Sequence, residues 1–336
     1  GAPRPYVTGE SQDVTVEHLA TKLWPTLAGV ELPDPVDVAA VDALITDMAL
    51  PGIIAPNAAR CALELATLDC ALRASDVSVG ALLPPQRATV TYGGVVTATS
   101  LEAAVRRARQ MKLVGLTDIK LKVGMGDDVE RVRAVREAIG PQVSLRLDAN
   151  GAWHLDEALQ VLRAVEPFQI AAVEQPLPRD AFDDLRALKR ASPIPLMVDE
   201  SLVTLDDAER LLGDEVVDMV NIRISKCGGL YRSMEIARQA AAAGVGVQVG
   251  SHVGETAILS ATGRHLAAWL PEVAFVEGSY GTLLLVEDVS AEPVHFGHRG
   301  RAPVLLGPGL GVEVVEERLG RYAQRVLELS PPEGHG

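Results

Sequence analysis

Hydrophobic residues recur at helical spacing through the first 80 residues of the chain. Residues 16–29 and 31–49 each show apolar positions three and four apart, and the first of these stretches ends at a glycine. Residues 57–74 are apolar on almost all sides, which is typical of a buried helix, so we expect this helix to lie between two domains. The Pro-containing residues 82–86 then predict a linker.

From residue 87 onward the pattern changes to short β-rich runs that alternate with amphipathic helical stretches. The predicted strands are 88–92, 118–123, 143–150, 170–176, 195–201, 217–224, 245–251 and 273–279. Strands that alternate with helices indicate a parallel sheet with crossover helices. Eight such units at near-even spacing favour closure into a (β/α)₈ TIM-type barrel, which we expect to span residues 87–285.

The remainder of the chain is expected to form a cap on this barrel. Residues 1–86 are predicted to be an N-terminal, mostly helical capping domain. Residues 286–336 contain a Gly/Pro-rich stretch and one last helical pattern, and we expect them to return to the cap and complete it. The expected fold class is therefore α/β, a barrel with a capping domain.

Composition and charge exclude several classes of protein. With 48% hydrophobic and 23% charged residues, the chain is too apolar to be mainly disordered, and no run of about 20 apolar residues suggests a membrane span. A net charge of −14 without a basic patch argues against a nucleic-acid partner. Cys61, Cys70 and Cys227 form no CxxC pair or zinc spacing, and the N-terminus lacks a secretory pattern, so a cytoplasmic location is expected.

Three consecutive predicted strands each end in a carboxylate: Asp148, Glu174 and Asp199. In a barrel the C-terminal strand ends meet at one rim, so these side chains should converge. Carboxylates that converge need a positive group among them, and oxygen-only ligands suit Mg²⁺, with Mn²⁺ as a substitute. Each residue alone would be read as an ordinary surface acid, but three in register favour a metal site.

Two lysines lie next to this expected site. Lys120 and Lys122 are two residues apart on one predicted strand and therefore face the same side, into the barrel mouth. Adjacent ammonium groups repel, which favours a neutral lysine that can act as a general base. Beside Mg²⁺ such a base could remove a proton next to a carboxylate, while the metal stabilises the enediolate.

As a set, these motifs resemble the enolase superfamily and, within it, the muconate lactonizing enzyme-like subgroup. The motifs are Lys-Leu-Lys at 120–122, RLDANGAW at 146–153, VEQP at 173–176, VDES at 198–201 and NIRISKCGG at 221–229. The resemblance covers nearly the whole chain. It implies a homo-oligomer and an α+β capping domain that opens with a three-stranded sheet; we expect this sequence to begin at the end of that sheet.

The resemblance also assigns roles to individual residues. It implies Mg²⁺ on Asp148, Glu174 and Asp199. Lys122 would be the general acid/base, with Lys120 as its electrostatic neighbour. Asn150 resembles a residue that lies close to the metal without binding it.

On the sixth strand the sequence departs from the subgroup. The second catalytic lysine of the subgroup stands five residues before a Gly-Gly pair, where this chain has Arg223. An arginine stays protonated and is a poor base, although it can hold a carboxylate, stabilise the enediolate or pair with Glu200. Lys226 falls where the subgroup carries a cation that is not catalytic. A two-lysine racemase mechanism is therefore weakened.

Two further residues at strand ends are candidates with open alternatives. His252 lies near the position of a histidine base in the mandelate racemase branch, although that branch has an aspartate where this chain has Arg223; the alternative is a packing role. Glu277 resembles a strand-eight acid that bonds or protonates the substrate, and the alternative is an acid paired with Arg or Lys. The Asp-x-Asp pair of dipeptide epimerases is absent from predicted strand eight, which disfavours that activity.

The leading hypothesis is a Mg²⁺-dependent enzyme that abstracts the α-proton of a small-molecule carboxylate. The outcome would be cycloisomerisation, racemisation or dehydration, and Arg223 favours a reaction with a single base. One alternative is a non-catalytic barrel that binds metal. Another is an aldolase-type barrel with a Schiff-base lysine, in which the three carboxylates would have no role.

Overall fold

Eight parallel strands in consecutive order form the central sheet. The computed structural model describes residues 1–336 except 33, 46–49, 51, 214–215 and 331–336. The strands are β2 Gly94–Val96, β3 Asp118–Lys122, β4 Ser144–Asp148, β5 Ile170–Glu174, β6 Leu196–Val198, β7 Met219–Ile222, β8 Gly246–Val249 and β9 Phe275–Val276. The N–H of Gly93 donates to the carbonyl of Val276 at 2.9 Å and so joins the last strand to the first. This confirms the predicted (β/α)₈ fold class.

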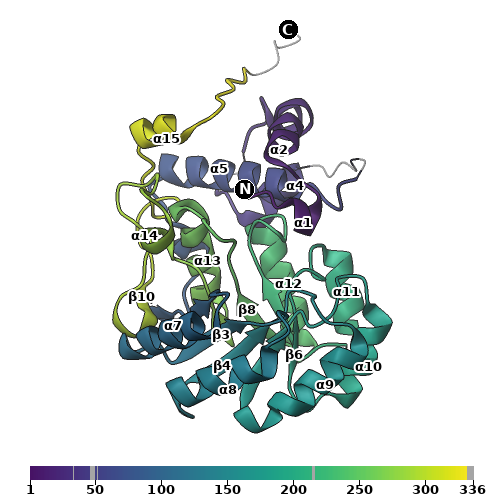
Figure 1. Ribbon diagram of the computed structural model, residues 1–336. Helices are drawn as coiled ribbons and strands as arrows, with labels where there is room; N and C mark the ends of the chain where they lie inside the picture. The colour runs from purple at the N-terminus through teal and green to yellow at the C-terminus, as the bar shows by residue number, and fades with distance from the viewer. Residues whose placement is uncertain (33, 46–49, 51, 214–215, 331–336) are drawn as a thin grey trace.

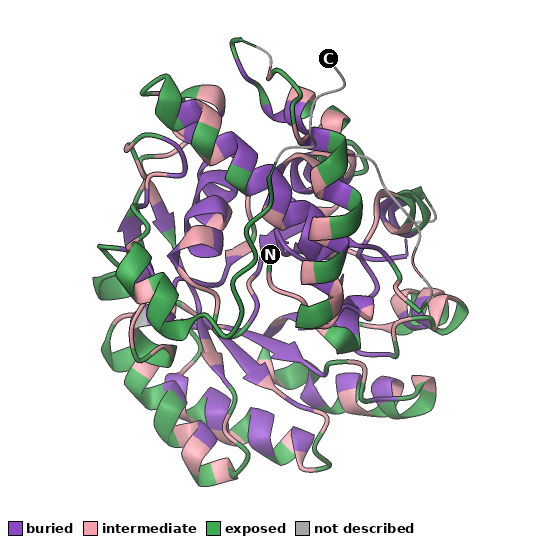
Figure 2. Cartoon of the chain, turned by 90° about the horizontal axis from the view of Figure 1, so that it is seen from above, coloured by how far each residue is buried: buried purple, intermediate pink, exposed green. Residues whose placement is uncertain are grey.

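Helices surround this barrel and bury one face each against it (Figures 1 and 2). They are α7 Leu101–Leu113, α8 Asp128–Ile139, α9 Leu155–Val165 with the 3₁₀ turn Glu166–Phe168, α10 Phe182–Ala191, α11 Leu205–Gly213, α12 Leu230–Ala242 and α13 Ala257–Trp269. Figure 2 shows buried residues gathered at the centre and exposed ones along the outer helix faces. The strands are buried on both sides, as the crossover helices require.

The prediction that residues 88–92 form the first strand of the barrel is wrong. A strand does form there, β1 Thr89–Thr91, but it pairs antiparallel with β10 Arg301–Pro303 outside the barrel. The first barrel strand is β2. It was not predicted because the pair Gly93-Gly94 is typical of a turn. A Cβ on Gly94 would lie 2.7 Å from Sδ of Met111, so the glycine is there to let α7 pack closely.

A layer of helices lies over one end of the barrel (Figure 1). They are α1 Pro5–Thr8, α2 Gln12–His18, a π-helical turn Leu19–Leu23, α3 Trp24–Leu27, α4 Val38–Leu44, α5 Asn57–Ala74 and α6 Val79–Leu82. As its all-round apolar pattern indicates, α5 is largely buried. Its Asn57 amide donates to the carbonyls of Val203 and Lys226 in the barrel loops, at 2.8 and 2.6 Å.

The C-terminal segment also reaches α5. It contains α14 Gly281–Leu284, a 3₁₀ turn His298–Gly300, β10 and α15 Glu316–Tyr322. The N–H of Leu310 donates to Asp69 of α5 at 2.8 Å, and Gly309 exchanges backbone hydrogen bonds with Val77 and Val79. None of the helices among the described residues combines the length and the apolar character that crossing a bilayer requires.

Candidate active site at the strand ends

Three carboxylates lie together at the C-terminal ends of the strands. Asp148 ends β4 and Glu174 ends β5, and the two are partners in the parallel register. Asp199 follows β6, two positions after Met197, which is the partner of Glu174. All three side chains are buried. The structure therefore brings to one rim the acids that the spacing of the predicted strands placed there.

Lys120 stands among these acids. Its Nζ lies 3.0 Å from Glu174, 3.2 Å from Asp148 and 2.8 Å from Glu277. Burial alone would lower the pKa of Lys120, but the three carboxylates outweigh burial and hold this pKa well above its ordinary value. The expectation that the two lysines lower each other's pKa is therefore not met at Lys120, whose charged form the three acids favour.

Lys122 has a different environment from Lys120. Its Nζ donates to Asp148 and to the side-chain oxygen of Asn150, and its side chain keeps 25% of its exposure. Asn150 follows β4 with a φ of 45°, a conformation that asparagine adopts more readily than most residues. That turn holds Asn150 between Lys122 and Glu200, whose Oε1 accepts from the Asn150 amide at 3.1 Å.

Arg223 lies on the other side of the carboxylates. It donates to Asp199 through Nη2, which also lies 3.9 Å from Glu174, so its charge is shared by two of the three acids. Pairing with Glu200, considered from the sequence, is not the ion pair that forms, because Glu200 points toward Asn150 instead. The side chain of Arg223 is only 9% exposed.

Lys226 lies beneath the third carboxylate and is completely buried. Its Nζ donates to the carboxylate and the carbonyl of Asp199 and to the carbonyl of Asn221, at 2.9, 2.6 and 2.8 Å. All three ammonium hydrogens are used by these contacts. Such a lysine fixes Asp199 and the loop after β7, and it has no donor left for a substrate.

Glu277 and His252 occupy the last two strand ends. Glu277 is buried and paired, with Oε2 toward Lys120 and Oε1 toward Arg146. The Nδ1 of His252 lies 3.4 Å from Nη1 of Arg223. Burial, and then nearby cations with Arg223 first, hold the pKa of His252 well below its ordinary value, so the ring is uncharged at neutral pH.

Several polar residues that sequence analysis missed hold the carboxylates in place. Asn221 and Gln248 donate to the two oxygens of Glu174 at 2.8 and 3.2 Å, and the side-chain oxygen of Gln175 accepts from the N–H of Asp199 at 2.9 Å. Asn221 and Gln248 could have been identified from the sequence. Asn221 lies two positions before Arg223, and Gln248 lies on a buried strand, so both are polar residues at inward positions of the barrel.

The donor atoms of the three carboxylates are of the kind that binds a divalent ion. The set is oxygen-only, and Oε2 of Glu200, next to Asp199, is buried with no hydrogen-bond partner. In the described part of the chain, no three His, Cys, Asp or Glu side chains have the spacing that holds a metal, because lysine and arginine groups separate the acids. The donors fit Mg²⁺ in kind, and its binding requires Lys122 and Arg223, which contact Asp148 and Asp199, to move aside.

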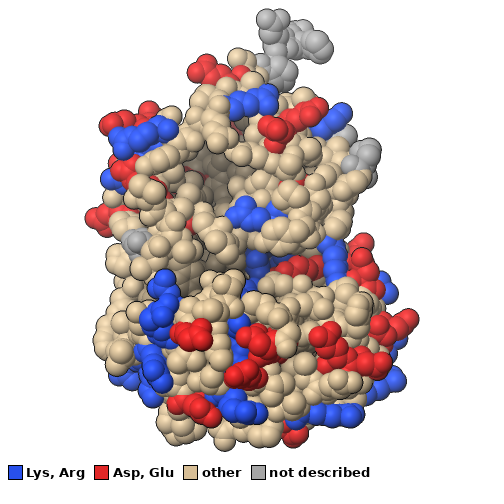
Figure 3. Space-filling view, in the orientation of Figure 1, with Lys and Arg blue, Asp and Glu red and all other residues tan. Residues whose placement is uncertain are grey.

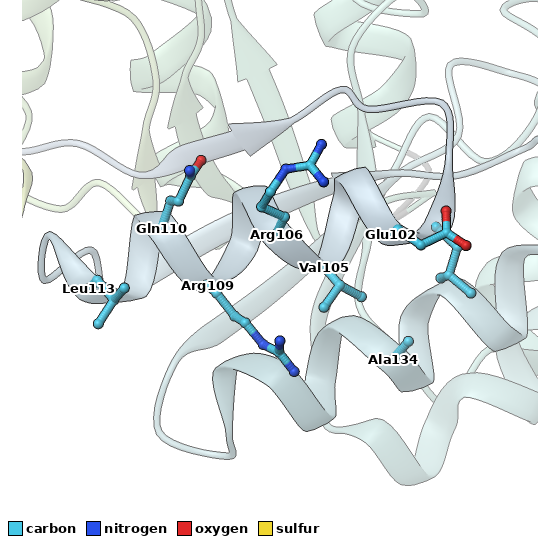
Figure 4. A pocket seen from close by; sticks show the side chains of 8 residues that line it. Glu102, Val105, Arg106, Arg109, Gln110, Leu113 and Ala134 are labelled. Carbon is cyan, nitrogen blue, oxygen red and sulfur yellow. The ribbon is translucent and has the colours of Figure 1, made fainter.

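An open pocket elsewhere on the surface is not part of this site. It has a volume of about 600 Å³ and lies between α7 and α8, with Leu101, Val105 and Leu113 among its lining (Figure 4). Arg106 and Arg109 extend from α7 at its edge. None of the acids at the strand ends lines it. Figure 3 shows acidic and basic side chains interspersed on one face of the molecule.

Known proteins match both the sequence and the geometry. The family model described as Enolase C-terminal domain-like matches residues 103–318, which include β3 to β9. N-succinyl-L-Arg/Lys racemase of Bacillus cereus is 30% identical over 328 residues, which cover 95% of this chain and 84% of the racemase. The o-succinylbenzoate synthase of Thermobifida fusca is 35% identical over 240 residues, with 70% and 71% coverage.

Solved structures show the same likeness. The crystal structure of N-succinyl Arg/Lys racemase from Bacillus cereus has a TM-score of 0.87 at 28% identity and covers 97% of this chain and 86% of its own. 2-Chloromuconate cycloisomerase from Rhodococcus opacus has a TM-score of 0.85 at 30% identity, with 96% and 86% coverage. The chain therefore belongs to the enolase superfamily, as a muconate lactonizing enzyme-like enzyme of the isomerase type.

Proposed function

We propose that this enzyme removes the α-proton of a small-molecule carboxylate, with Lys122 as the base. One observation carries the proposal. Among the four cations beside the three acids, Lys122 keeps 25% of its side-chain exposure, whereas Lys120, Arg223 and Lys226 keep 3%, 9% and 0%. Lys122 is thus the amine that an incoming substrate can reach.

Members of the enolase superfamily generally depend on a divalent metal ion. Here Asp148, Glu174 and Asp199 would hold it, and we propose Mg²⁺ because the donors are carboxylate oxygens. A bound Mg²⁺ would supply the positive charge that lowers the energy of the enediolate. Lys120 and Lys226 would keep the acids aligned, since both are buried and contact Glu174 and Asp199.

The arrangement supports a reaction with one base. Lys122 takes the proton on its nitrogen, and the electron pair of the C–H bond moves into the enediolate. On the opposite side Arg223 stays charged and can hold or neutralise substrate oxygens, but it cannot accept a proton. We therefore propose cycloisomerisation or dehydration before racemisation, which would need a second base.

Racemisation remains the second candidate, and His252 supports it. Its uncharged ring lies beside Arg223 and could serve as the missing base.

We also propose that residues 1–86 and 286–336 act together as the cap, because α5 contacts both the barrel loops and the C-terminal segment. We further propose that the enzyme assembles into a homo-oligomer.

The test is exchange of the α-proton for deuterium in D₂O, first screened by NMR over a library of carboxylates with Mg²⁺ present. With a substrate in hand, Lys122→Met should abolish exchange and retain Mg²⁺ binding, because the amine is lost and the three acids remain. His252→Asn should keep exchange. If exchange survives in Lys122→Met and disappears in His252→Asn, the base lies on the other face and racemisation gains support.

A further inference from the structure

Arg146 crosses the interior of the barrel below the candidate site. It lies on β4, two positions before Asp148, and its side chain is completely buried. Nε and Nη2 make a two-point contact with Asp118 at the start of β3, at 3.1 and 2.6 Å. The guanidinium also lies 4.3 Å from the ring centre of Phe275 on β9. One side chain therefore connects β4 with strands on either side of the barrel.

Arg146 has a second cation as its neighbour. Lys120 is its register partner on β3, so the two positive side chains point into the barrel next to each other. Glu277 separates them, with Oε1 at 2.9 Å from Arg146 and Oε2 at 2.8 Å from Lys120. With one oxygen bound to Arg146, the carboxylate of Glu277 is fixed so that its other oxygen meets Lys120.

Arg146 also decides the orientation of an amide. Its Nη1 donates to the side-chain oxygen of Gln248, which leaves the Gln248 NH₂ group to donate to Glu174 at 3.2 Å. If the amide turned over, its oxygen would face the carboxylate of Glu174 and repel it. Two chains of contacts thus run from Arg146 to Glu174, one through Gln248 and one through Glu277 and Lys120.

We propose that Arg146 is a positioning residue that holds Glu277 and Gln248 where they fix Lys120 and Glu174. It does not touch the substrate and acts only through these neighbours. The proposal rests on the proposed function in that Glu174 is taken as a metal ligand. Residues that orient metal ligands typically change metal affinity about 10- to 100-fold when they are lost.

The experiment compares Arg146→Gln and Arg146→Lys with a matched control, Arg131→Gln. Arg131 is also a buried arginine, but it pairs with Asp127 and with the carbonyls of Ala98 and Thr99, away from the acids. Crystal structures of the variants and calorimetric titration with Mg²⁺ alone are the two readouts. Titrations are run at a temperature at which circular dichroism shows every variant folded.

For Arg146→Gln we expect displaced Glu277 and Gln248 side chains and Mg²⁺ binding about 10- to 100-fold weaker. Arg131→Gln should lose thermal stability and keep the Mg²⁺ affinity of the wild type. Arg146→Lys should keep the contact with Glu277 but lose the two-point contact with Asp118. Its Mg²⁺ affinity should therefore lie between those of Arg146→Gln and the wild type. If Arg146→Gln does not fold, Arg146→Lys decides by the same two readouts.

Unmoved Glu277, Gln248 and Lys120 in the crystal structure, or an unchanged Mg²⁺ affinity in Arg146→Gln, would overturn the positioning role. A wild-type protein that binds no Mg²⁺ would instead count against the proposed function. The crystal structure would still decide about Arg146 in that case, because the displacement of Glu277 and Gln248 is measured without metal.

Discussion

Side chains at the barrel mouth are held by buried ion pairs. What each side chain contributes to stability depends on the partners that it contacts. Lys226 illustrates this, because its ammonium donates to the carboxylate and the carbonyl of Asp199 and to the carbonyl of Asn221, and its side chain is completely buried. A buried charge that loses its partner remains desolvated, and nothing replaces the lost attraction. The free energy in such a pair is therefore seen mainly when one member is removed.

We expect Lys226→Met to lower the free energy of unfolding by about 3 kcal/mol, because Asp199 would keep only the contact with Arg223 and the buried carbonyl of Asn221 would lose its donor. Urea denaturation checks this, with Lys189→Met as the matched control. Lys189 pairs with Asp218 at 2.8 Å, but both side chains are 32% exposed. Its loss should cost less than about 1 kcal/mol, and equal effects of the two variants would contradict the argument.

At the scale of elements, the contact between α5 and α12 joins the helical layer to the barrel. Glu64 of α5 accepts the first free N–H groups of α12, those of Leu230 and Tyr231, so a buried carboxylate caps a helix of a different part of the fold. Gly229 precedes α12 with a φ of 124°, and a Cβ there would lie 2.0 Å from Glu64. Gly229 is thus required by this close approach.

This contact should make stability depend on pH. Burial raises the pKa of Glu64 from 4.5 to about 7 in spite of its hydrogen bonds. Between these values the folded state binds a proton that the unfolded state releases, so the stability contributed by Glu64 falls as the pH rises through this window. The loss is at most about 3 kcal/mol.

The measurement is the difference in free energy of unfolding between the wild type and Glu64→Gln, taken at about pH 5 and about pH 8. We expect the wild type to lose stability relative to the variant at the higher pH, because glutamine does not titrate. Glu102→Gln, at an exposed position on α7, should show no such change. A difference that stays constant with pH would show that Glu64 does not titrate in this range.

At the scale of the whole molecule, the N-terminal segment lies across the barrel mouth. Arg4 donates to the carbonyl of Val253 after β8 at 2.6 Å, and Arg179 after β5 donates to the carbonyl of Val7. The N–H of Ala2 donates to Ser225 after β7 at 2.7 Å. Loops of three strands are tied to this segment. The three acids come from three different strands, so an ion that all three hold would bind only the folded molecule.

Mg²⁺ should therefore stabilise the folded molecule as a whole. A ligand at 100 times its dissociation constant adds about 2.7 kcal/mol when it binds the folded state alone, so added Mg²⁺ should raise Tm and a chelator should reverse the rise. Asp148→Asn should remove this response, whereas Asp218→Asn, outside the acids, should keep it. A rise in Tm that persists in Asp148→Asn would place the ion elsewhere.

The barrel and the candidate residues at its rim could be predicted from local patterns in the amino-acid sequence. Parallel strands buried on both sides leave continuous apolar runs, and the residue after each run must lie at the same end of the sheet. Asp148, Glu174 and Asp199 could therefore be predicted to converge before any coordinates were known. Their separation along the chain reflects one strand–helix unit each, which is a local property of the sequence.

Which charges pair with one another became visible only in the folded molecule. Contacts such as Arg146 with Glu277, or Glu64 with α12, join residues more than 100 positions apart, and no local pattern encodes them. The first barrel strand was also misplaced, because Gly94 resembles a turn until the packing of α7 against it is seen. A buried charge is costly unless it is paired, but which partner is near depends on how the barrel closes.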